Sequence, residues 1–121
     1  MNIYLDIDGV LLKKHGEPAD NVLDFLKEMT DNHDCYWLTT HCRNGESNAV
    51  EYLEDKLPNE ALEYLNKIKP AYWDTLKTEA IDFSKKFKWY DDYIMEAEES
   101  VLKENNCLDS FVRVENSKLI Y

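Results

Sequence analysis

Short apolar blocks rich in β-branched and aromatic residues recur along the chain and are typical of buried strands. The first block contains Ile3, Leu5 and Ile7, and it stops at Gly9. The other blocks predict strands over residues 35–40, 87–92 and 111–114.

Between these blocks the apolar residues recur at helical spacing, which predicts amphipathic helices. The first helix begins near Pro18, precedes a polar turn at 31–34 and has these inward positions: Val22, Phe25, Leu26 and Met29. Ser47 is a candidate cap for a second helix that Pro58 ends, after a loop at Arg43, Asn44 and Gly45. Further helices are predicted over residues 60–69, 76–83 and 94–105.

Strands that alternate with helices predict a parallel, right-handed α/β sheet covered on both faces. The expected fold class is therefore α/β, a three-layer α/β/α arrangement of the Rossmann-like kind. The 121 residues are enough for one domain with a real core and too few for two, so residues 1–121 are expected to form a single domain.

Charge and apolar content narrow the classes of partner. With 25 acidic and 14 basic residues the net charge is −11, which disfavours nucleic acids and anionic membranes. No apolar run approaches the roughly 20 residues that a membrane span needs, so we expect a cytoplasmic protein with no membrane partner. Three cysteines without a short Cys-x-x-Cys pair argue against a disulfide framework.

Polar residues follow three of the predicted strands where each strand ends. They are Asp6 and Asp8, Thr39 and Thr40, and Asp91 and Asp92. Because ligands bind at the carboxyl ends of parallel strands, these residues predict a site at one sheet edge. Asp6 and Asp8 would leave the same side of an extended backbone and repel unless a cation or positively charged groups lie between them. A turn that uses Asp8 beside Gly9 explains one acid but not the other.

Four motifs in chain order resemble those of the haloacid-dehalogenase (HAD) superfamily. DIDGV is similar to the first motif and WLTT to the second, Lys77 within LKTEAI resembles the third, and WYDD resembles the fourth. Together they cover residues 3–92. The resemblance implies a small HAD-like phosphohydrolase without a large cap, acting on a phosphate monoester through an aspartyl-phosphate intermediate.

The resemblance also implies a role for each catalytic residue. Asp6 resembles the nucleophile that attacks phosphorus, and Asp8 resembles the general acid/base. Thr39 would hydrogen-bond a phosphoryl oxygen, although Thr40 is an alternative ligand. Lys77 would neutralise the nucleophile and the developing charge.

The cofactor implied by the resemblance is Mg²⁺, a hard cation that takes oxygen ligands. Asp6, Asp91 and the main-chain carbonyl of Asp8 would hold it, and Asp92 would act through water or cap a helix. The substrate is a phosphorylated compound of unknown identity. A polynucleotide end is conceivable by analogy, but the charge of −11 speaks against it.

Several alternatives stay open at the level of sequence. The lysine of the third motif has nearby alternatives: Lys67, Lys69, Lys85 and Lys86. His41 and Arg43 either contact substrate or are ordinary loop residues. A zinc site from the histidines and cysteines between His33 and Cys42 is disfavoured because their spacing matches no finger pattern.

Two rival functions compete with the phosphohydrolase. A phosphorylation-receiver domain has similar groups, but the order of its motifs differs from the order in this chain. A non-catalytic HAD-like binding or regulatory module would keep the fold without turnover. The third strand that the resemblance requires between Leu57 and Lys77 is hard to see, which predicts a sheet shortened there.

Overall fold

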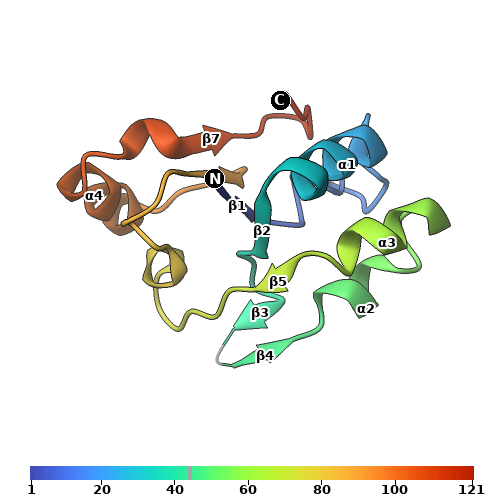
Figure 1. Ribbon diagram of the computed structural model, residues 1–121, viewed down its shortest axis with the longest axis horizontal. Coiled ribbons are helices and arrows are strands. Elements are labelled where there is room, and N and C mark those ends of the chain that lie inside the picture. The colour runs from blue at the N-terminus through green and yellow to red at the C-terminus, as the bar shows by residue number, and fades with distance from the viewer. Residues whose placement is uncertain (44) are drawn as a thin grey trace.

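A computed structural model gives the structure of residues 1–43 and 45–121. Its centre is a five-stranded sheet in the order β5-β2-β1-β6-β7, and every neighbouring pair is parallel (Figure 1). The strands are β1 (Asn2–Leu5), β2 (Asp34–Trp37), β5 (Lys69–Pro70), β6 (Phe87–Asp91) and β7 (Phe111–Arg113). The predicted parallel α/β sheet is confirmed, and its layout is Rossmann-like.

Helices pack on both faces of this sheet. One face carries α1 (Val22–Asn32), α2 (Ala49–Leu53) and α3 (Leu62–Leu65). The opposite face carries α4 (Glu96–Glu104) and a short 3-10 helix, Lys77–Ala80. In Figure 1, α4 lies across the sheet from the other three helices. Two further 3-10 turns cover Asn59–Ala61 and Leu108–Ser110.

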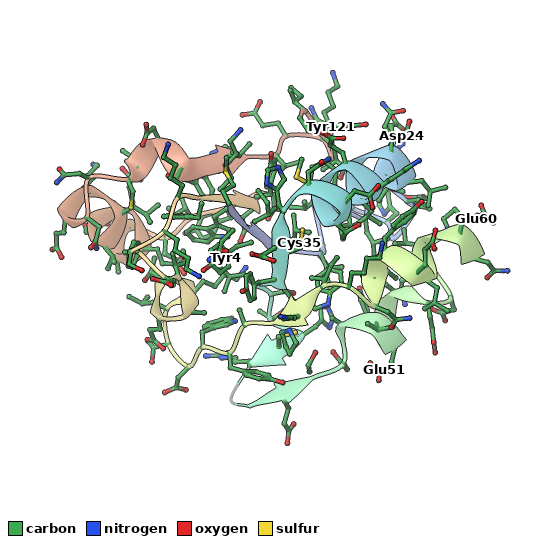
Figure 2. All side chains as sticks on the ribbon, viewed as in Figure 1. Tyr4, Asp24, Cys35, Glu51, Glu60 and Tyr121 are labelled. Carbon is green, nitrogen blue, oxygen red and sulfur yellow. The ribbon has the colours of Figure 1, made fainter. Side chains whose placement is uncertain are left out.

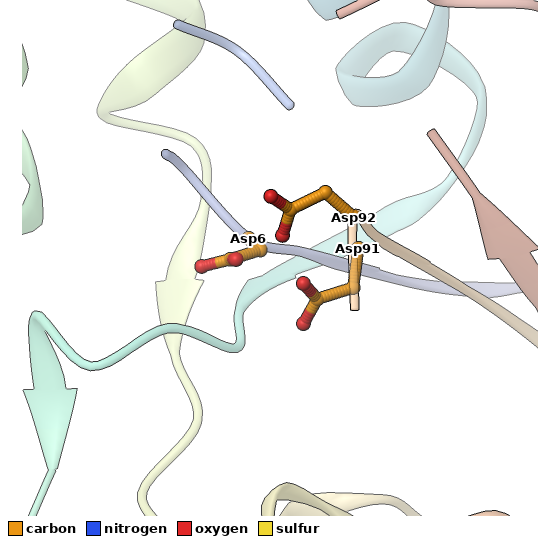
Figure 3. A group of neighbouring side chains, drawn as sticks. All are labelled: Asp6, Asp91 and Asp92. Atoms are coloured by element: carbon orange, nitrogen blue, oxygen red, sulfur yellow. The ribbon is translucent and has the colours of Figure 1, made fainter. Parts of the chain in front are cut away.

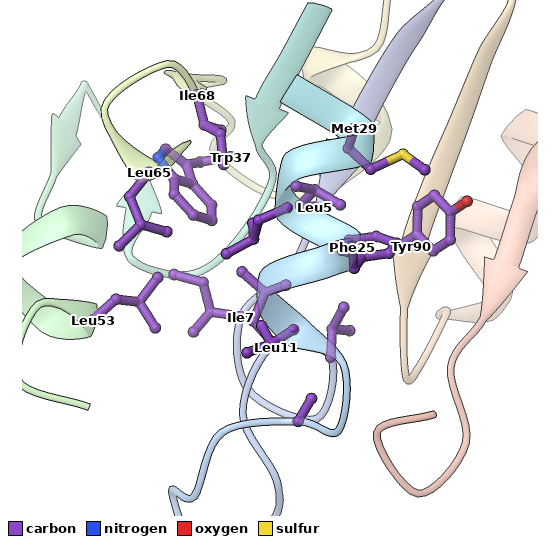
Figure 4. Close-up of a cluster of buried hydrophobic side chains, with 14 of the residues drawn as sticks. Leu5, Ile7, Leu11, Phe25, Met29, Trp37, Leu53, Leu65, Ile68 and Tyr90 are labelled. Carbon is purple, nitrogen blue, oxygen red and sulfur yellow. The ribbon is translucent and has the colours of Figure 1, made fainter. Parts of the chain in front are cut away.

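Side chains of the central strands alternate between two apolar clusters, one on each face. Leu5 of β1 packs with Phe25 of α1 in the first cluster, and Figure 4 shows these residues beside Trp37. Tyr4 of β1 belongs to the second cluster with Trp89 of β6. Because both faces of these strands are buried, their sequences are nearly continuous runs of apolar residues.

Acidic side chains lie mainly on the outside of the molecule. Asp24, Glu51 and Glu60 are exposed on the helices and turns, whereas Tyr4 and Cys35 lie inside (Figure 2). Among the described helices, none has both the length and the apolar composition needed to cross a membrane.

The segment between β2 and α2 differs from the predicted loop and cap. Cys42–Arg43 forms β3 and pairs antiparallel with Glu46–Ser47, which forms β4. Ser47 is therefore part of a hairpin rather than a helix cap, because its backbone pairs with Cys42. The helix α2 begins at Ala49 instead. Of the predicted loop residues, Asn44 lies outside the described residues.

The predicted helix over 60–69 is also wrong at its carboxyl end. The helix α3 ends at Leu65, and Lys69–Pro70 forms the short edge strand β5 beside β2. Proline has no N–H to donate and is tolerated in such an edge strand. The strand that was hard to see between Leu57 and Lys77 is thus β5, and it is only two residues long. The predicted helix over 76–83 is shorter too, reduced to the 3-10 turn Lys77–Ala80.

Candidate functional site

The carboxyl ends of β1, β2 and β6 place three polar side chains at one edge of the sheet. Asp6 directly follows β1, and its backbone N–H donates to the Tyr90 carbonyl at 3.0 Å. Asp91 is the last residue of β6, and Thr39 lies two residues beyond β2. All three side chains are buried. The parallel pairing of β1 with β2 and β6 brings these three predicted residues to the same edge of the sheet.

Three carboxylates converge at this edge. Asp6, Asp91 and Asp92 each offer an oxygen atom, and these atoms all lie within 4.8 Å of one another. Figure 3 shows the three side chains around a common space. Asp91 is only 2% exposed, whereas Asp92 is exposed. An all-oxygen set of this kind suits a hard divalent cation.

Lys77 is the cation of this cluster. Its Nζ lies 2.7 Å from Asp91 Oδ2 and 3.5 Å from Asp6 Oδ2. The other lysines considered from the sequence lie elsewhere: Lys67 pairs with Asp31 on α1, Lys69 lies in the edge strand β5, and Lys85 and Lys86 precede β6 at its opposite end. The structure therefore selects Lys77 from the predicted candidates as the lysine beside the acids.

The protonation of the cluster reflects its burial and charge. Burial and the Asp6 carboxylate raise the pKa of Asp91 to about 6, against the opposing effect of the Lys77 ammonium. Burial alone would lower the pKa of Lys77, but the Asp6 and Asp91 carboxylates outweigh it and raise that pKa above its ordinary value. Partial burial and Asp91 also raise the pKa of Asp92. One ammonium does not fully compensate three acids.

Glu98 on α4 holds the segment that carries Lys77. Its side chain is 3% exposed, and Oε2 accepts the backbone N–H of Lys77 at 2.8 Å. Oε1 accepts the backbone N–H of Met95 at 3.0 Å. The buried carboxylate thus ties the start of the 3-10 turn to the start of α4. Sequence reasoning missed this residue because it lies in the acidic run EAEE, where a buried glutamate has the same pattern as an exposed one.

The two threonines after β2 have different environments. Thr39 is fully buried; its Oγ1 accepts the His41 backbone N–H at 3.3 Å, and its carbonyl accepts the Trp73 indole N–H at 3.0 Å. Thr40 is exposed. Thr40 also lines a cleft of about 250 Å³ with Trp73, and the same cleft contains Asp6, Lys77, Asp91, Asp92 and Tyr93. Thr40 is therefore the better placed of the two to meet a ligand in this cleft.

Asp8 lies apart from the carboxylate cluster. Its side chain is 57% exposed and faces two aromatic residues. Tyr52 of α2 donates its hydroxyl to Asp8 Oδ1 at 2.8 Å, and His41 Nε2 lies 3.1 Å from Asp8 Oδ2. His41 was only one of two loop residues considered for substrate contact, and Tyr52 gave no signal because it lies 44 residues from Asp8 in the chain.

Gly9 allows the turn after β1 to pass close to Asp92. Its φ is +83°, and a Cβ built at this position would collide with the Asp92 carboxylate. Both the left-handed backbone and the close approach therefore require glycine here.

The residues weighed for zinc do not assemble into a site. Among the described residues, Asp6, Asp91 and Asp92 form the one group of three or more potential metal ligands. Cys35 is buried in the sheet, and burial with the nearby Asp34 charge raises the pKa of its thiol to about 12. A thiol in that environment is a poor metal ligand at neutral pH.

The fold and the site define an α/β protein with a partly buried cluster of acids at the carboxyl ends of its parallel strands. Comparison of the chain with protein-family models, curated proteins and solved structures gave no match.

Proposed function

We propose that this protein is a metal-dependent phosphohydrolase of the haloacid-dehalogenase type, acting on phosphate monoesters. The observation that carries the proposal is the convergence of Asp6, Asp91 and Asp92 in a cleft at the carboxyl ends of the strands, with Lys77 paired to the first two. The motif order from DIDGV to WYDD supports the same assignment.

In the first step, a carboxylate oxygen of Asp6 attacks the phosphorus atom of the ester. The bond from phosphorus to the leaving oxygen breaks, and the carboxylic acid of Asp8 supplies the proton that the leaving alcohol requires. The product is an aspartyl-phosphate on Asp6 and a free alcohol. Lys77 lies beside Asp6 and would stabilise the negative charge of the transferred phosphoryl oxygens.

In the second step, Asp8, now a carboxylate, accepts a proton from water. The water oxygen attacks phosphorus, and the bond from phosphorus to Asp6 breaks. Inorganic phosphate leaves, Asp6 returns to a carboxylate, and Asp8 is again an acid. The exposed side chain of Asp8 suits a group that must meet both the leaving alcohol and water.

The residues fit a divalent cation. Three carboxylates meet with one ammonium between two of them, and the raised pKa of Asp91 reflects burial and uncompensated negative charge. The carboxylates of Asp6 and Asp91 with the main-chain carbonyl of Asp8 would hold Mg²⁺, and Asp92 would contact it directly or through water. Such an ion would supply charge neutralisation that lets a phosphate dianion approach Asp6.

The experiment is a phosphatase screen of the purified protein over sugar phosphates, nucleotides, phosphopeptides, phosphorylated DNA ends and p-nitrophenyl phosphate. We expect turnover with Mg²⁺, loss of turnover in EDTA and recovery on adding Mg²⁺ back. Asp6→Asn should abolish turnover and keep the thermal unfolding midpoint near that of the wild type, because an amide cannot attack phosphorus.

The same screen separates the enzyme from a binding module. Binding of a phosphorylated compound without turnover of any ester would favour a non-catalytic HAD-like module. Turnover that is indifferent to EDTA would contradict the role of the metal while leaving the hydrolase intact.

A further inference from the structure

A group of three side chains outside the acid cluster positions Asp8: two contact its carboxylate, and the third contacts one of those two. Tyr52 donates its hydroxyl to one carboxylate oxygen, and His41 Nε2 is within hydrogen-bond distance of the other. The His41 and Tyr52 rings stack with centroids 3.9 Å apart and planes 26° from parallel. Asn48 Oδ1 lies 3.2 Å from His41 Nδ1, so both ring nitrogens of His41 have partners.

The hairpin β3–β4 fixes two members of this group. His41 precedes β3 and Asn48 follows β4, and the Asn48 backbone N–H donates to the His41 carbonyl at 2.9 Å. The His41 backbone N–H donates in turn to the buried Thr39. The histidine ring is thus oriented by contacts at both its backbone and its side chain, and its side chain is only 18% exposed.

Tyr52 is fixed from the other side by α2. Its ring packs against the apolar cluster that covers the α1 face of the sheet. Lys56 Nζ lies 4.1 Å from the centroid of the Tyr52 ring, and the same ammonium donates to the Tyr52 carbonyl. Two side chains from separate elements, Tyr52 and His41, therefore each contact one oxygen of the exposed Asp8 carboxylate.

The held carboxylate also faces open space next to the cluster. Asp8 and Asp92 line the same hollow of about 550 Å³, which continues along Lys13, Lys14 and Ser117. Each carboxylate oxygen has more than one lone pair, so the contacts to His41 and Tyr52 leave acceptor positions on Asp8 free. A leaving group that extends from the acid cluster into this hollow would pass Asp8.

We propose that His41 and Tyr52 are positioning residues that fix the Asp8 carboxyl group in the orientation needed for proton transfer to the leaving oxygen. This inference rests on the proposed phosphohydrolase function. Rigid placement matters because an exposed aspartate otherwise samples several rotamers, and a misplacement of about 1 Å can cost about 10²-fold in rate. Asn48 supports the group by orienting the imidazole.

The test compares Tyr52→Phe with Tyr64→Phe in the full-length protein with Mg²⁺. Tyr52→Phe removes the hydroxyl bonded to Asp8 and keeps the ring that stacks on His41. Tyr64 is a matched control, since it also packs partly buried against the same apolar cluster but lies on α3. The substrates are phenyl phosphate, whose leaving group needs a proton, and dinitrophenyl phosphate, whose leaving group does not.

We expect Tyr52→Phe to lower kcat/KM for phenyl phosphate by about 10- to 100-fold and to leave kcat/KM for dinitrophenyl phosphate almost unchanged. The comparison uses kcat/KM because this parameter reports the steps up to release of the leaving group, whereas the later hydrolysis of the aspartyl-phosphate is common to both esters. His41→Ala should show the same pattern, and His41→Gln should recover part of the loss because the amide N–H can reach the carboxylate. Introducing Tyr52→Phe into Asp8→Asn should have no further effect, since the two changes remove one function.

Equal losses of kcat/KM for both substrates, or equal behaviour of Tyr52→Phe and Tyr64→Phe, would overturn the positioning role. Turnover by the wild-type protein would still support the hydrolase in that case. An additional loss from Tyr52→Phe in the Asp8→Asn background would overturn it as well. A wild-type protein without turnover of either ester in Mg²⁺ would instead overturn the proposed function, and the positioning role with it.

Discussion

Lys77 and Asp91 form a buried ion pair in which Nζ and Oδ2 are 2.7 Å apart, although the two residues lie on different elements. The same ammonium lies 3.5 Å from Asp6, so one lysine links the ends of β1 and β6. A pair buried to this degree is costly to break, because the partner left behind keeps its charge in a poorly solvated place. Lys77 therefore has a structural effect as well as its proposed catalytic one.

Lys77→Met should affect both stability and turnover. Removing the ammonium leaves Asp6 and Asp91 to repel each other, and breaking a buried pair of this kind costs about 3–5 kcal/mol. Turnover should fall by about 10²-fold or more, as for the loss of one charge-stabilising donor. Urea unfolding and kcat measurements check the two effects, with the exposed Lys86→Met as the matched control.

Added Mg²⁺ separates these two effects of Lys77→Met. A bound cation would compensate the carboxylates and restore the free energy of unfolding, but it would not replace the lost contact to the phosphoryl group. Recovery of full turnover at high Mg²⁺ would contradict a catalytic role for Lys77.

The pKa of Asp91 predicts a pH-dependent stability for the metal-free protein. The pKa is 3.8 for an ordinary aspartate and about 6 in the folded protein, so the folded state binds this proton more tightly than the unfolded state. This contribution to stability is fully present below the unfolded value and is lost as the pH rises through about 6. In EDTA, Asp91→Asn should therefore gain stability relative to wild type as the pH rises.

The expected change in that difference is on the order of 1–3 kcal/mol between about pH 4 and pH 7. Urea unfolding of both proteins over this pH range measures it, and the subtraction cancels the titration of acids that are remote from Asp91. A difference that is constant with pH would show that Asp91 titrates normally in the folded protein.

The strand ends are the part of the site that the sequence predicts best. Parallel strands finish at one edge, so the polar residues that follow them must meet there whatever the details of the helices. Asp6, Thr39 and Asp91 are brought together for this reason. The sequence does not show which of several lysines lies beside the acids. The number of residues before β6 does not determine where the 3-10 turn that carries Lys77 begins.

The surroundings of Asp8 depend on tertiary contacts between residues far apart in the chain, which the local sequence pattern does not indicate. His41 lies 33 residues and Tyr52 lies 44 residues from Asp8, and both reach it only through the β3–β4 hairpin and α2. That hairpin was predicted as a loop. Glu98 was missed for a related reason, since a buried acid that accepts backbone N–H groups has the same sequence pattern as an exposed acid.

Gly9→Ala tests the close approach between the turn after β1 and Asp92. A left-handed φ costs a non-glycine residue about 1–2 kcal/mol, and the added methyl group would also displace the Asp92 carboxylate. We expect a loss of stability together with a higher Mg²⁺ requirement for turnover. Thermal unfolding and Mg²⁺ titrations of activity measure the two effects.

Gly16→Ala is the matched control for this change. Gly16 has φ +91°, but a Cβ there would meet no atom within 4 Å. Gly16→Ala should therefore lose a similar amount of stability and keep the wild-type Mg²⁺ requirement. The same Mg²⁺ requirement in both variants would show that backbone strain alone explains Gly9→Ala.

The last prediction ranks Asp91 above Asp92 in metal binding. Side chains alternate along β6, so Asp91 lies on the same side of the strand as Phe87 and Trp89 and is buried like them. Asp92 is exposed. A buried carboxylate keeps little hydration and has less to lose when it binds a cation directly, while an exposed one can act through water. Asp91→Asn should therefore raise the Mg²⁺ concentration for half-maximal turnover more than Asp92→Asn does. For a partner acting through water, losses of about 10- to 100-fold are typical, which sets the scale expected for Asp92→Asn. Mg²⁺ titrations of both variants beside the remote Asp109→Asn measure the order, and a larger effect of Asp92→Asn would reverse the assignment.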